Sequence, residues 1–247
     1  MKKKSSNKKH ETIFGKILLT LGLILLILSY TLASFYNGLL LLKIFSWSIL
    51  YIGVLSMFTN QGHPYRKSWK FIKDSKNYIW ASIVLFIIFI AIGFIFPVFF
   101  REEIFNFIKS LDMQISNLGL LEVIWFIFTN NLKTSFFSIV LGLMLGVFPI
   151  VTAIINGYLI GFVSRQVTAE AGLLVLWRLF PHGIFELPAV IISIGMGIRL
   201  GFILIWPKKN KKFKDEILDA IRTFVFVILP ALVIAGIIEG ILVFFLK

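Results

Sequence analysis

A histidine, a glutamate and two prolines lie close together inside an otherwise apolar stretch of this chain. They belong to the segment 180–189, which reads Phe-Pro-His-Gly-Ile-Phe-Glu-Leu-Pro-Ala. His182 and Glu186 are four residues apart, so on a helix they would share one face. An ionisable side chain in hydrocarbon needs a partner, a cavity or the protein interior, and Pro188 leaves a backbone carbonyl without its helical donor. We therefore expect a polar site of structural or functional importance in this segment.

Two interpretations of this polar segment stay open. In the structural interpretation, His182 hydrogen-bonds a carbonyl freed by the prolines, and Glu186 caps exposed amides at a helix N-terminus. In the functional interpretation, the two side chains bind a substrate or an ion. A metal site is not expected, because zinc needs three or four ligands and the two other histidines, His10 and His63, lie in basic segments.

Three further polar residues lie in the apolar C-terminal half of the chain. Asn156 occurs in a long apolar run shortly after Pro149, which predicts a kinked helix. Arg199 and Glu239 lie within or near the ends of apolar runs. Each could extend its charged group to the membrane surface, or the two could form a buried ion pair.

The sequence contains no recognisable catalytic constellation. It has no H-E-x-x-H, G-x-S-x-G or P-loop pattern. It has no cysteine, which excludes disulfides, thiolate metal sites and a cysteine nucleophile. A histidine–glutamate pair could move protons but has neither a nucleophile nor a metal beside it. We therefore expect no enzyme activity, no catalytic residues, no metal and no cofactor.

The composition indicates that membrane helices position these residues. The chain is 58% hydrophobic and 15% charged, whereas a soluble domain has about 25% charged residues. Its net charge of +13 does not indicate nucleic-acid binding. The lysines cluster between apolar segments, as in loops that face the cytoplasm and anionic lipid. The predicted fold class is all-α, a polytopic transmembrane helical bundle.

The apolar runs predict about six membrane-embedded segments. They cover residues 13–35, 38–59, 79–100, 134–163, 173–206 and 221–246. The turn-forming residues 36–38 suggest that the first two runs form a tight hairpin. The positive-inside rule places the N-terminus and the basic loop 60–78 in the cytoplasm. We therefore divide the chain into 1–78, with an extra hairpin, and 79–247, the main membrane domain.

Residues 101–133 are then predicted to lie outside. Apolar residues alternate at spacings of four and three, which places them in one stripe along an amphipathic helix: Ile104, Ile108, Leu111, Ile115 and Leu118. The stripe could face the outer membrane surface or the protein's own spans. Periodicity alone does not distinguish lipid from protein.

The basic segment 208–214 conflicts with a simple alternation of spans. It should be cytoplasmic, yet single spans at 134–163 and 173–206 would leave it outside. An odd number of crossings or an exception to the rule would resolve the conflict. We favour a re-entrant or broken helix near residues 181–188, where protein or water would cover the freed backbone.

Paired glycines mark the C-terminal half for close helix packing. Glycines four residues apart align on one helix face and let another backbone approach. The pairs are Gly142 and Gly146, Gly157 and Gly161, Gly197 and Gly201, and Gly236 and Gly240. Their number predicts a compact helical core. Whether any pair forms a homodimer stays open.

The motifs of the C-terminal half resemble the stage II sporulation protein M family. The resemblance rests on Asn131-Leu132, Asn156-Gly-x-x-x-Gly161, the block 181–189 and Gly197-x-Arg-x-Gly201, and it covers residues 79–246. It implies a polytopic integral membrane protein. In spore-forming bacteria it implies a member of the engulfment complex that anchors or scaffolds peptidoglycan-degrading partners. The family also occurs in bacteria and archaea that do not form spores, where its role is unknown. This chain differs by its extra hairpin, 13–59, and its short outer segment.

Three functions compete at this point. The favoured one is a non-enzymatic scaffold or anchor in the cell membrane, with membrane or envelope proteins docking on the outer helix or the basic loops. The alternative is a transporter or channel component with its site around Asn156, His182 and Glu186. An intramembrane enzyme is the third, and it lacks the catalytic groups. Every version has the lipid bilayer as a partner and no nucleic acid.

Overall fold

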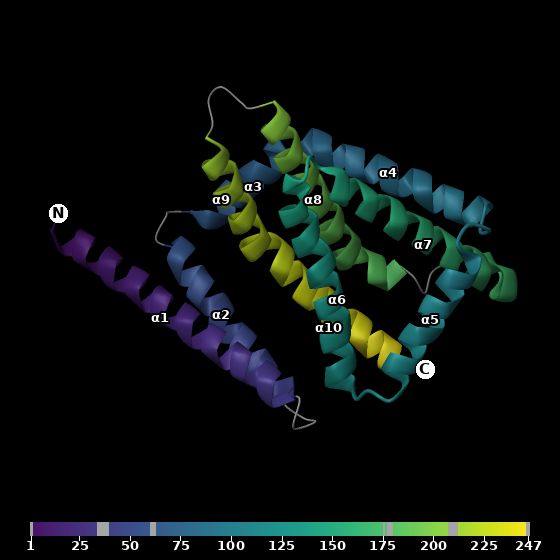
Figure 1. Ribbon diagram of the computed structural model, residues 1–247, viewed down its shortest axis with the longest axis horizontal. Helices are drawn as coiled ribbons and strands as arrows, with labels where there is room; N and C mark the ends of the chain where they lie inside the picture. Colours follow the sequence, from purple (N-terminus) through teal and green to yellow (C-terminus); the bar gives the residue numbers. More distant parts are fainter. Residues whose placement is uncertain are drawn as a thin grey trace. The chain divides into compact units, whose positions relative to one another are not determined.

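The computed structural model describes most of this chain as α-helix (Figure 1). It describes residues 2–33, 40–59, 63–174, 176, 180–206 and 212–245. Within these ranges it gives no side-chain description for residues 2–12, 14, 31–33, 59 and 180–185. The chain forms two compact units, Met1–Ser68 and Trp69–Lys247. The sequence suggested a boundary at residue 78. In the structure, residues 69–78 belong to the second unit, because Phe71 and Ser75 contact Arg199 of that unit.

The first unit is a helical hairpin. It consists of α1 (Lys2–Ala33), α2 (Leu40–Thr59) and the start of α3 (Pro64–Asp74). Glycines bring the first two helices together: a Cβ atom on Gly22 would lie 2.8 Å from the backbone nitrogen of Leu50, and one on Gly53 would lie 2.9 Å from that of Leu19. The predicted turn at 36–38 lies outside the described residues.

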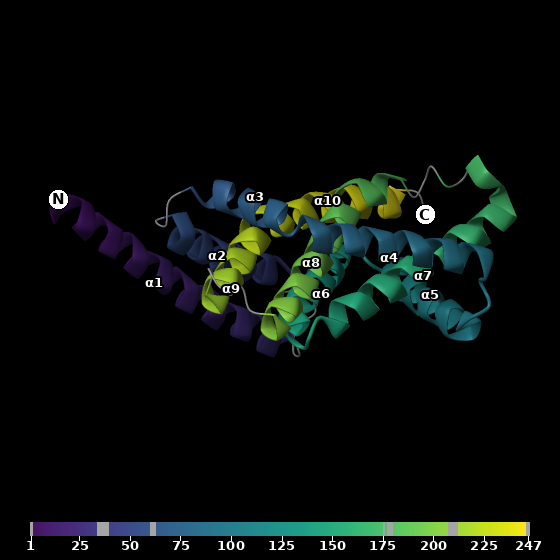
Figure 2. The same cartoon turned by 90° about the horizontal axis from the view of Figure 1, so that it is seen from above.

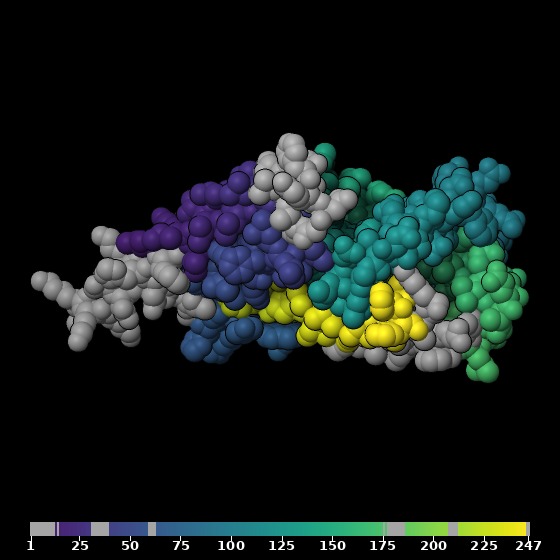
Figure 3. Space-filling model, turned by 90° about the horizontal axis from the view of Figure 1, so that it is seen from below, coloured from purple at the N-terminus to yellow at the C-terminus, as the bar shows by residue number. Residues whose placement is uncertain are grey.

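The second unit is a bundle of helices joined by short connections. Its elements after α3 are α4 (Lys76–Ile95), α5 (Arg101–Ser116), α6 (Leu120–Val140), η1 (Leu141–Leu143), α7 (Val147–Ala171), α8 (Phe180–Ile205), α9 (Phe213–Thr223), η3 (Phe224–Ile228) and α10 (Leu229–Phe245). Figure 3 shows α6 and the end of α10 side by side on one face.

Helix α8 lies at the centre of this bundle (Figure 2). Of its candidate span, 67% is buried, against 39% or less for the other described spans. Two apolar clusters meet on it. One contains Met196 and Leu200 with residues of α3, α6, α9 and α10. The other contains Ile194 with Phe86 of α4 and Ala153 of α7. A helix that is apolar all round is typical of such a buried position.

Six described helices are long and apolar enough to cross a membrane. They are Leu40–Phe58, Lys76–Ile95, Leu120–Leu143, Val147–Ala171, Glu186–Ile205 and Phe213–Phe245, and Gly15–Tyr30 is a shorter apolar segment. The chain is therefore a multi-pass membrane protein with an all-α fold, as the sequence predicted. Two predictions about the course of the spans, however, were wrong.

The predicted single span 134–163 is in fact two helices. A span begins at Leu120, within the segment predicted to lie outside, and the chain turns at η1 before α7 begins. The turn uses Leu145 and Gly146 with φ of 57° and 76°, and glycine adopts such left-handed backbone at little cost. Pro149 produces no mid-helix kink, because it lies in the first turn of α7, where a missing N–H breaks no helical bond.

The predicted break near residues 181–188 was also wrong. Helix α8 continues through Pro188, and Pro181 lies in its first turn. A proline inside a membrane helix removes one hydrogen bond and is tolerated where surrounding protein covers the freed group. Three spans, α6, α7 and α8, therefore connect α5 to the basic segment before α9. This is an odd number of crossings, one of the alternatives that the sequence left open.

Helices α9 and α10 form one long span with a wide turn at its middle. In η3, a π-helical turn, the N–H of Leu229 bonds the carbonyl of Phe224, five residues earlier. Pro230 follows directly and has no N–H to donate to residue 226. The wide turn accommodates this proline without interrupting the helix.

The predicted amphipathic helix on the outer segment is present as α5. None of its residues is buried, and its apolar stripe is half-buried. Phe105 packs edge-on against Phe162 of α7, with ring centroids 5.6 Å apart. The hydroxyl of Tyr158, also on α7, accepts a hydrogen bond from the N–H of Phe99 at 3.0 Å. Helix α7 therefore holds the connection between α4 and α5.

Candidate functional site

The paired glycines lie at backbone-to-backbone contacts within the second unit. A Cβ atom on Gly197 would lie 2.9 Å from the carbonyl carbon of Ser138 on α6, and one on Gly201 would lie 2.6 Å from the Cα of Gly146. Similar approaches bring α7 against α4 at Gly157 and Gly161, and α10 against α6 at Gly236 and Gly240. Side chains larger than hydrogen would force these helices apart. The glycines set how closely the polar residues on neighbouring helices can meet.

Arg199 is the largest fully buried side chain among the described residues, with 1% exposed. Its guanidinium forms an ion pair with Glu216 of α9, whose side chain is 0% exposed, at 2.8 Å. It also donates to the hydroxyl of Ser75 at 2.8 Å and to the carbonyl of Phe71 at 3.3 Å. The guanidinium carbon lies 4.4 Å from the centre of the Phe71 ring, a cation–π distance. We call these four residues the Arg199 cluster.

The Arg199 cluster joins three parts of the chain at one end of the bundle. Ser75 connects α3 to α4, Arg199 lies near the end of α8, and Glu216 lies in the first turn of α9. Because one side chain contacts all three, the junction of α3 with α4 and the start of α9 lie at the same end. This agrees with four spans, α4, α6, α7 and α8, between them. Burying two charges is costly unless each is paired and hydrogen-bonded, as these are.

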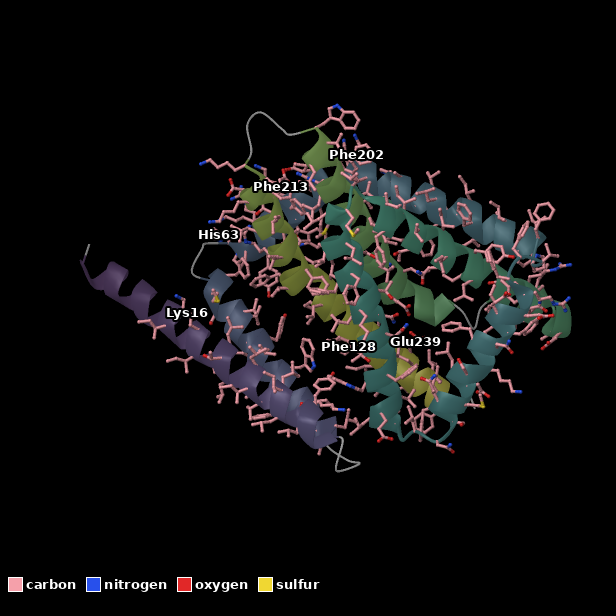
Figure 4. All side chains as sticks on the ribbon, viewed as in Figure 1. Lys16, His63, Phe128, Phe202, Phe213 and Glu239 are labelled. Carbon is pink, nitrogen blue, oxygen red and sulfur yellow. The ribbon has the colours of Figure 1, made fainter. Side chains whose placement is uncertain are left out.

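A second polar group lies about 20 Å further along α8, at 1.5 Å rise per residue. The side chain of Glu186 lies next to those of Glu239 of α10 and Asn131 of α6. Asn131 is 7% exposed. Figure 4 shows Glu239 far from Phe213, the residue that begins α9. We call Glu186, Glu239 and Asn131 the carboxyl group site.

The chemistry of the carboxyl group site follows from two carboxyl groups that lie side by side. A carboxylate only accepts, whereas a protonated carboxyl group can also donate. Two neighbouring carboxyl groups can therefore hydrogen-bond each other only when at least one of them carries a proton. Like charges in a poorly solvated place repel strongly, which disfavours ionising both groups. The site can hold or release a proton, and the amide of Asn131 can donate to whichever oxygen carries charge.

The remaining predicted residues fall in different places. Asn156 lies on α7, where its amide donates to the carbonyl of Thr152 at 2.8 Å, within its own helix. Pro188 lies inside α8 and is exposed. The backbone of His182 is helical, but its side chain lies outside the described residues. The suggested pairing of Arg199 with Glu239 was wrong, because the two charges lie at opposite ends of the bundle and each has a different partner.

Sequence reasoning missed the partners Glu216, Ser75 and Asn131. A signal existed for Glu216: with Phe213, Ile217 and Ala220 it follows helical spacing, so it lies within the apolar stripe of α9. Asn131 was missed as a partner because residues 101–133 were predicted to lie outside the membrane, so a span containing it was not expected. Ser75 gave no signal that separates it from other small polar residues.

Among the described residues, no group of three or more His, Cys, Asp or Glu side chains gathers in a way that could hold a metal ion. The Arg199 cluster is a structural junction whose charges are mutually paired. The carboxyl group site brings together two carboxyl groups and an amide from three different helices.

Comparison with known proteins shows to which protein family this bundle is related. The family model described as stage II sporulation protein M matches residues 82–243, which covers more than half of the chain. The chain belongs to the stage II sporulation protein M family. The match contains both polar sites of this family member except Phe71 and Ser75, and it excludes the N-terminal hairpin.

Two similar proteins, both described as uncharacterised, come from Methanocaldococcus jannaschii. One is 28% identical over 190 residues, covering 70% of this chain and 84% of the relative. The other is 30% identical over 166 residues, covering 64% of this chain and 90% of the relative. No solved structure matches this family member significantly. The comparisons therefore supply a family but no activity.

Proposed function

We propose that this member of the stage II sporulation protein M family is a non-enzymatic scaffold or anchor in the cell membrane. The observation that carries the proposal is α5, a helix of 16 residues of which none is buried. It is presented at one end of a bundle that glycine contacts hold together. Phe107 on α5 is 48% exposed and Met113 is 59% exposed. Exposed aromatic and methionine side chains are favoured at protein interfaces.

The proposal includes an orientation with the N-terminus in the cytoplasm. The end of the bundle at the Arg199 cluster bears the exposed lysines Lys70, Lys73, Lys76, Lys212 and Lys214. The other end, at α5, bears Glu102, Glu103 and Asp112 beside Arg101 and Lys109. The positive-inside rule assigns the lysine-rich end to the cytoplasm. Partners on α5 would then be envelope proteins or the outer parts of membrane proteins.

Co-purification from native membranes tests the scaffold. We expect the tagged protein to recover a recurrent partner in near-equal amount, and Phe107→Ser to reduce that recovery several-fold by removing apolar contact area. The neighbouring exposed change Asn106→Ser is the matched control and should leave recovery unchanged. Recovery of the protein alone, or equal loss with both variants, would contradict the proposal.

A homodimer would have to use a face other than the paired glycines. Most of these glycines already approach another backbone of the same chain, including Gly157, Gly197 and Gly240. Size measurement of the purified protein in detergent would report the dimer directly.

A second candidate function, transport of protons or another small cation, draws on the carboxyl group site. Ionisable residues inside membrane spans often mark proton or ion paths. Glu186 and Glu239 come from two different spans, and Asn131 comes from a third. A change in the charge of the pair would alter how these helices pack.

Proton flux into liposomes containing the purified protein tests the transport candidate. We expect Glu186→Gln to abolish flux, because an amide cannot exchange the shared proton, while Glu170→Gln on the exposed end of α7 keeps it. Flux equal to that of empty liposomes would eliminate this candidate and favour the scaffold alone.

A further inference from the structure

Basic and aromatic side chains form a continuous exposed surface where α3 meets α4. On α3, Trp69, Lys70 and Lys73 are exposed, and Trp69 is 54% exposed. On the first two turns of α4, Lys76 is exposed and Trp80 is 63% exposed. We call these five residues the basic–aromatic face. The scaffold proposal uses its lysines to assign the orientation, and neither proposed function gives the face a ligand.

The Arg199 cluster fixes the direction of this face. Phe71 and Ser75 lie on the opposite side of the same segment, with 1% and 0% of their surface exposed. Both accept hydrogen bonds from Arg199, through a carbonyl and a hydroxyl. The segment therefore cannot roll over without breaking a buried ion-pair network. As a result, the lysines and tryptophans of the face point away from the bundle.

The depth of the face in a membrane follows from the start of α4. Lys76 begins a span of 20 residues that has no other charged side chain. Lys73 precedes it by less than one helical turn, at most about 5 Å along the helix, and Lys70 by at most about 9 Å. The headgroup layer on each side of the hydrocarbon is about 5–8 Å thick. All three ammonium groups can therefore reach that layer on their flexible side chains.

We propose that the basic–aromatic face binds the headgroups of anionic phospholipids. Lysines complement lipid phosphates and the net charge of an anionic leaflet. Tryptophan favours the boundary between hydrocarbon and headgroups, and Trp69 and Trp80 lie on either side of Lys76 in sequence. Asp74 is the acidic residue of this segment, so the exposed charge of residues 69–80 is positive. Lys212 and Lys214, exposed next to Glu216 on α9, extend the positive surface at the same end.

An acidic protein partner would suit the charge but not the tryptophans. Trp80 is the fifth residue of a membrane span. At this depth, lipid covers the exposed surface of the bundle. A soluble acidic protein could reach Lys70 but not Trp80 at that depth. The pairing of lysines with an aromatic residue inside the span therefore favours lipid.

Native mass spectrometry of the intact protein in detergent tests this proposal. Phosphatidylglycerol and phosphatidylcholine with the same acyl chains are titrated in parallel. We expect wild type to retain phosphatidylglycerol preferentially, and Lys70→Gln/Lys73→Gln to lose roughly 25-fold of that preference, since each lysine near an anionic surface contributes about fivefold. The matched control, Arg101→Gln/Lys109→Gln, removes two exposed cations from the other end and should keep the preference.

Two results would overturn the proposal. One is equal retention of the two lipids by wild type. The other is an equal loss of preference in both double variants, which would indicate net charge rather than a defined face. As an independent measurement, lipids brominated near the headgroup should quench wild-type fluorescence more strongly than that of Trp69→Phe/Trp80→Phe. Unchanged quenching in that variant would place both tryptophans away from the lipid and count against the face.

Discussion

Arg199 has the most consequential side chain of this bundle because burial leaves its charge no alternative to the partners it has. Its guanidinium is held by a carboxylate, a hydroxyl, a carbonyl and an aromatic ring. A buried pair contributes little net stability compared with apolar residues of the same size, but removing one partner leaves an uncompensated charge. Substitutions in this cluster therefore test how much the pairing of Arg199 with its partners contributes to stability, and not the effect of one charge alone.

Arg199→Met should destabilise the protein by about 3–5 kcal/mol, because Glu216 would be left buried without its cation. The double variant Arg199→Met/Glu216→Leu should recover part of that loss. Thermal unfolding in detergent measures both, with Arg101→Met on exposed α5 as the control. A double variant less stable than Arg199→Met would mean that the pair stabilises the fold by itself.

At the scale of elements, glycines determine which helices touch. Helix α8 is the central one because residues on two of its sides approach α6 and α4 closely. A Cβ atom on Gly195 would lie 2.8 Å from the Cα of Ile79, and one on Gly197 would meet the backbone at Ser138. Packing of this kind fixes the positions of Glu186 and Arg199 relative to their partners.

Gly197→Ala should lower the free energy of unfolding by about 1–3 kcal/mol, the usual effect of overpacking a close contact. Gly119→Ala is the matched control, because its Cβ atom would meet only the end of the Glu122 side chain at 3.7 Å. Denaturation in mixed detergent micelles measures the difference. Equal stability of the two variants would show that α6 and α8 can separate without cost.

The same elements mark how far the sequence could predict the structure. The stripe of Ile104, Ile108, Leu111 and Ile115 predicted α5, and the paired glycines predicted close packing. The span beginning at Leu120 was missed because residues 101–133 were predicted to lie outside the membrane, whereas Asn131 is buried beside Glu186. Hydropathy measures one residue at a time and does not reveal a polar partner on another helix.

The sequence identified individual residues of the candidate sites but not which residues contact each other. Glu186, Arg199 and Glu239 were identified from their apolar surroundings. Charge complementarity then suggested Arg199 with Glu239, although Glu239 lies beside Glu186, which is about 20 Å from Arg199 along α8. Partners came from contacts between distant segments, such as Ser75 with Arg199, which only the folded arrangement specifies.

At the scale of the whole molecule, the number of spans determines which segments share a side of the membrane. Four spans separate the end of α3 from the start of α9, so the two must share a side, and α5 must lie on the other. The basic segments then gather on one side, as the positive-inside rule expects. The conflict in the sequence came from one missed span rather than from an exception to the rule.

Cysteine labelling tests this arrangement directly, because the chain has no cysteine of its own. In intact cells, Lys109→Cys on α5 should react with a membrane-impermeant maleimide. Lys73→Cys and Lys212→Cys should react only after the membrane is opened. The cysteine-free parent gives the background. Labelling of Lys73→Cys and Lys212→Cys on different sides would contradict the arrangement of spans.

The wide turn of η3 changes the direction in which the side chains of the last span point. In an uninterrupted α-helix, Glu216 and Glu239 would point about 140° apart, at 3.6 residues per turn. The π-helical turn takes up one additional residue, which reduces this angle to about 40°. One helix can therefore direct two carboxyl groups, at its two ends, toward the same neighbour. Deleting a single residue from this turn would convert it to ordinary α-helix and keep Glu239 near its present direction, whereas deleting one from α10 between the turn and Glu239 would rotate Glu239 by about 100° away from Glu186.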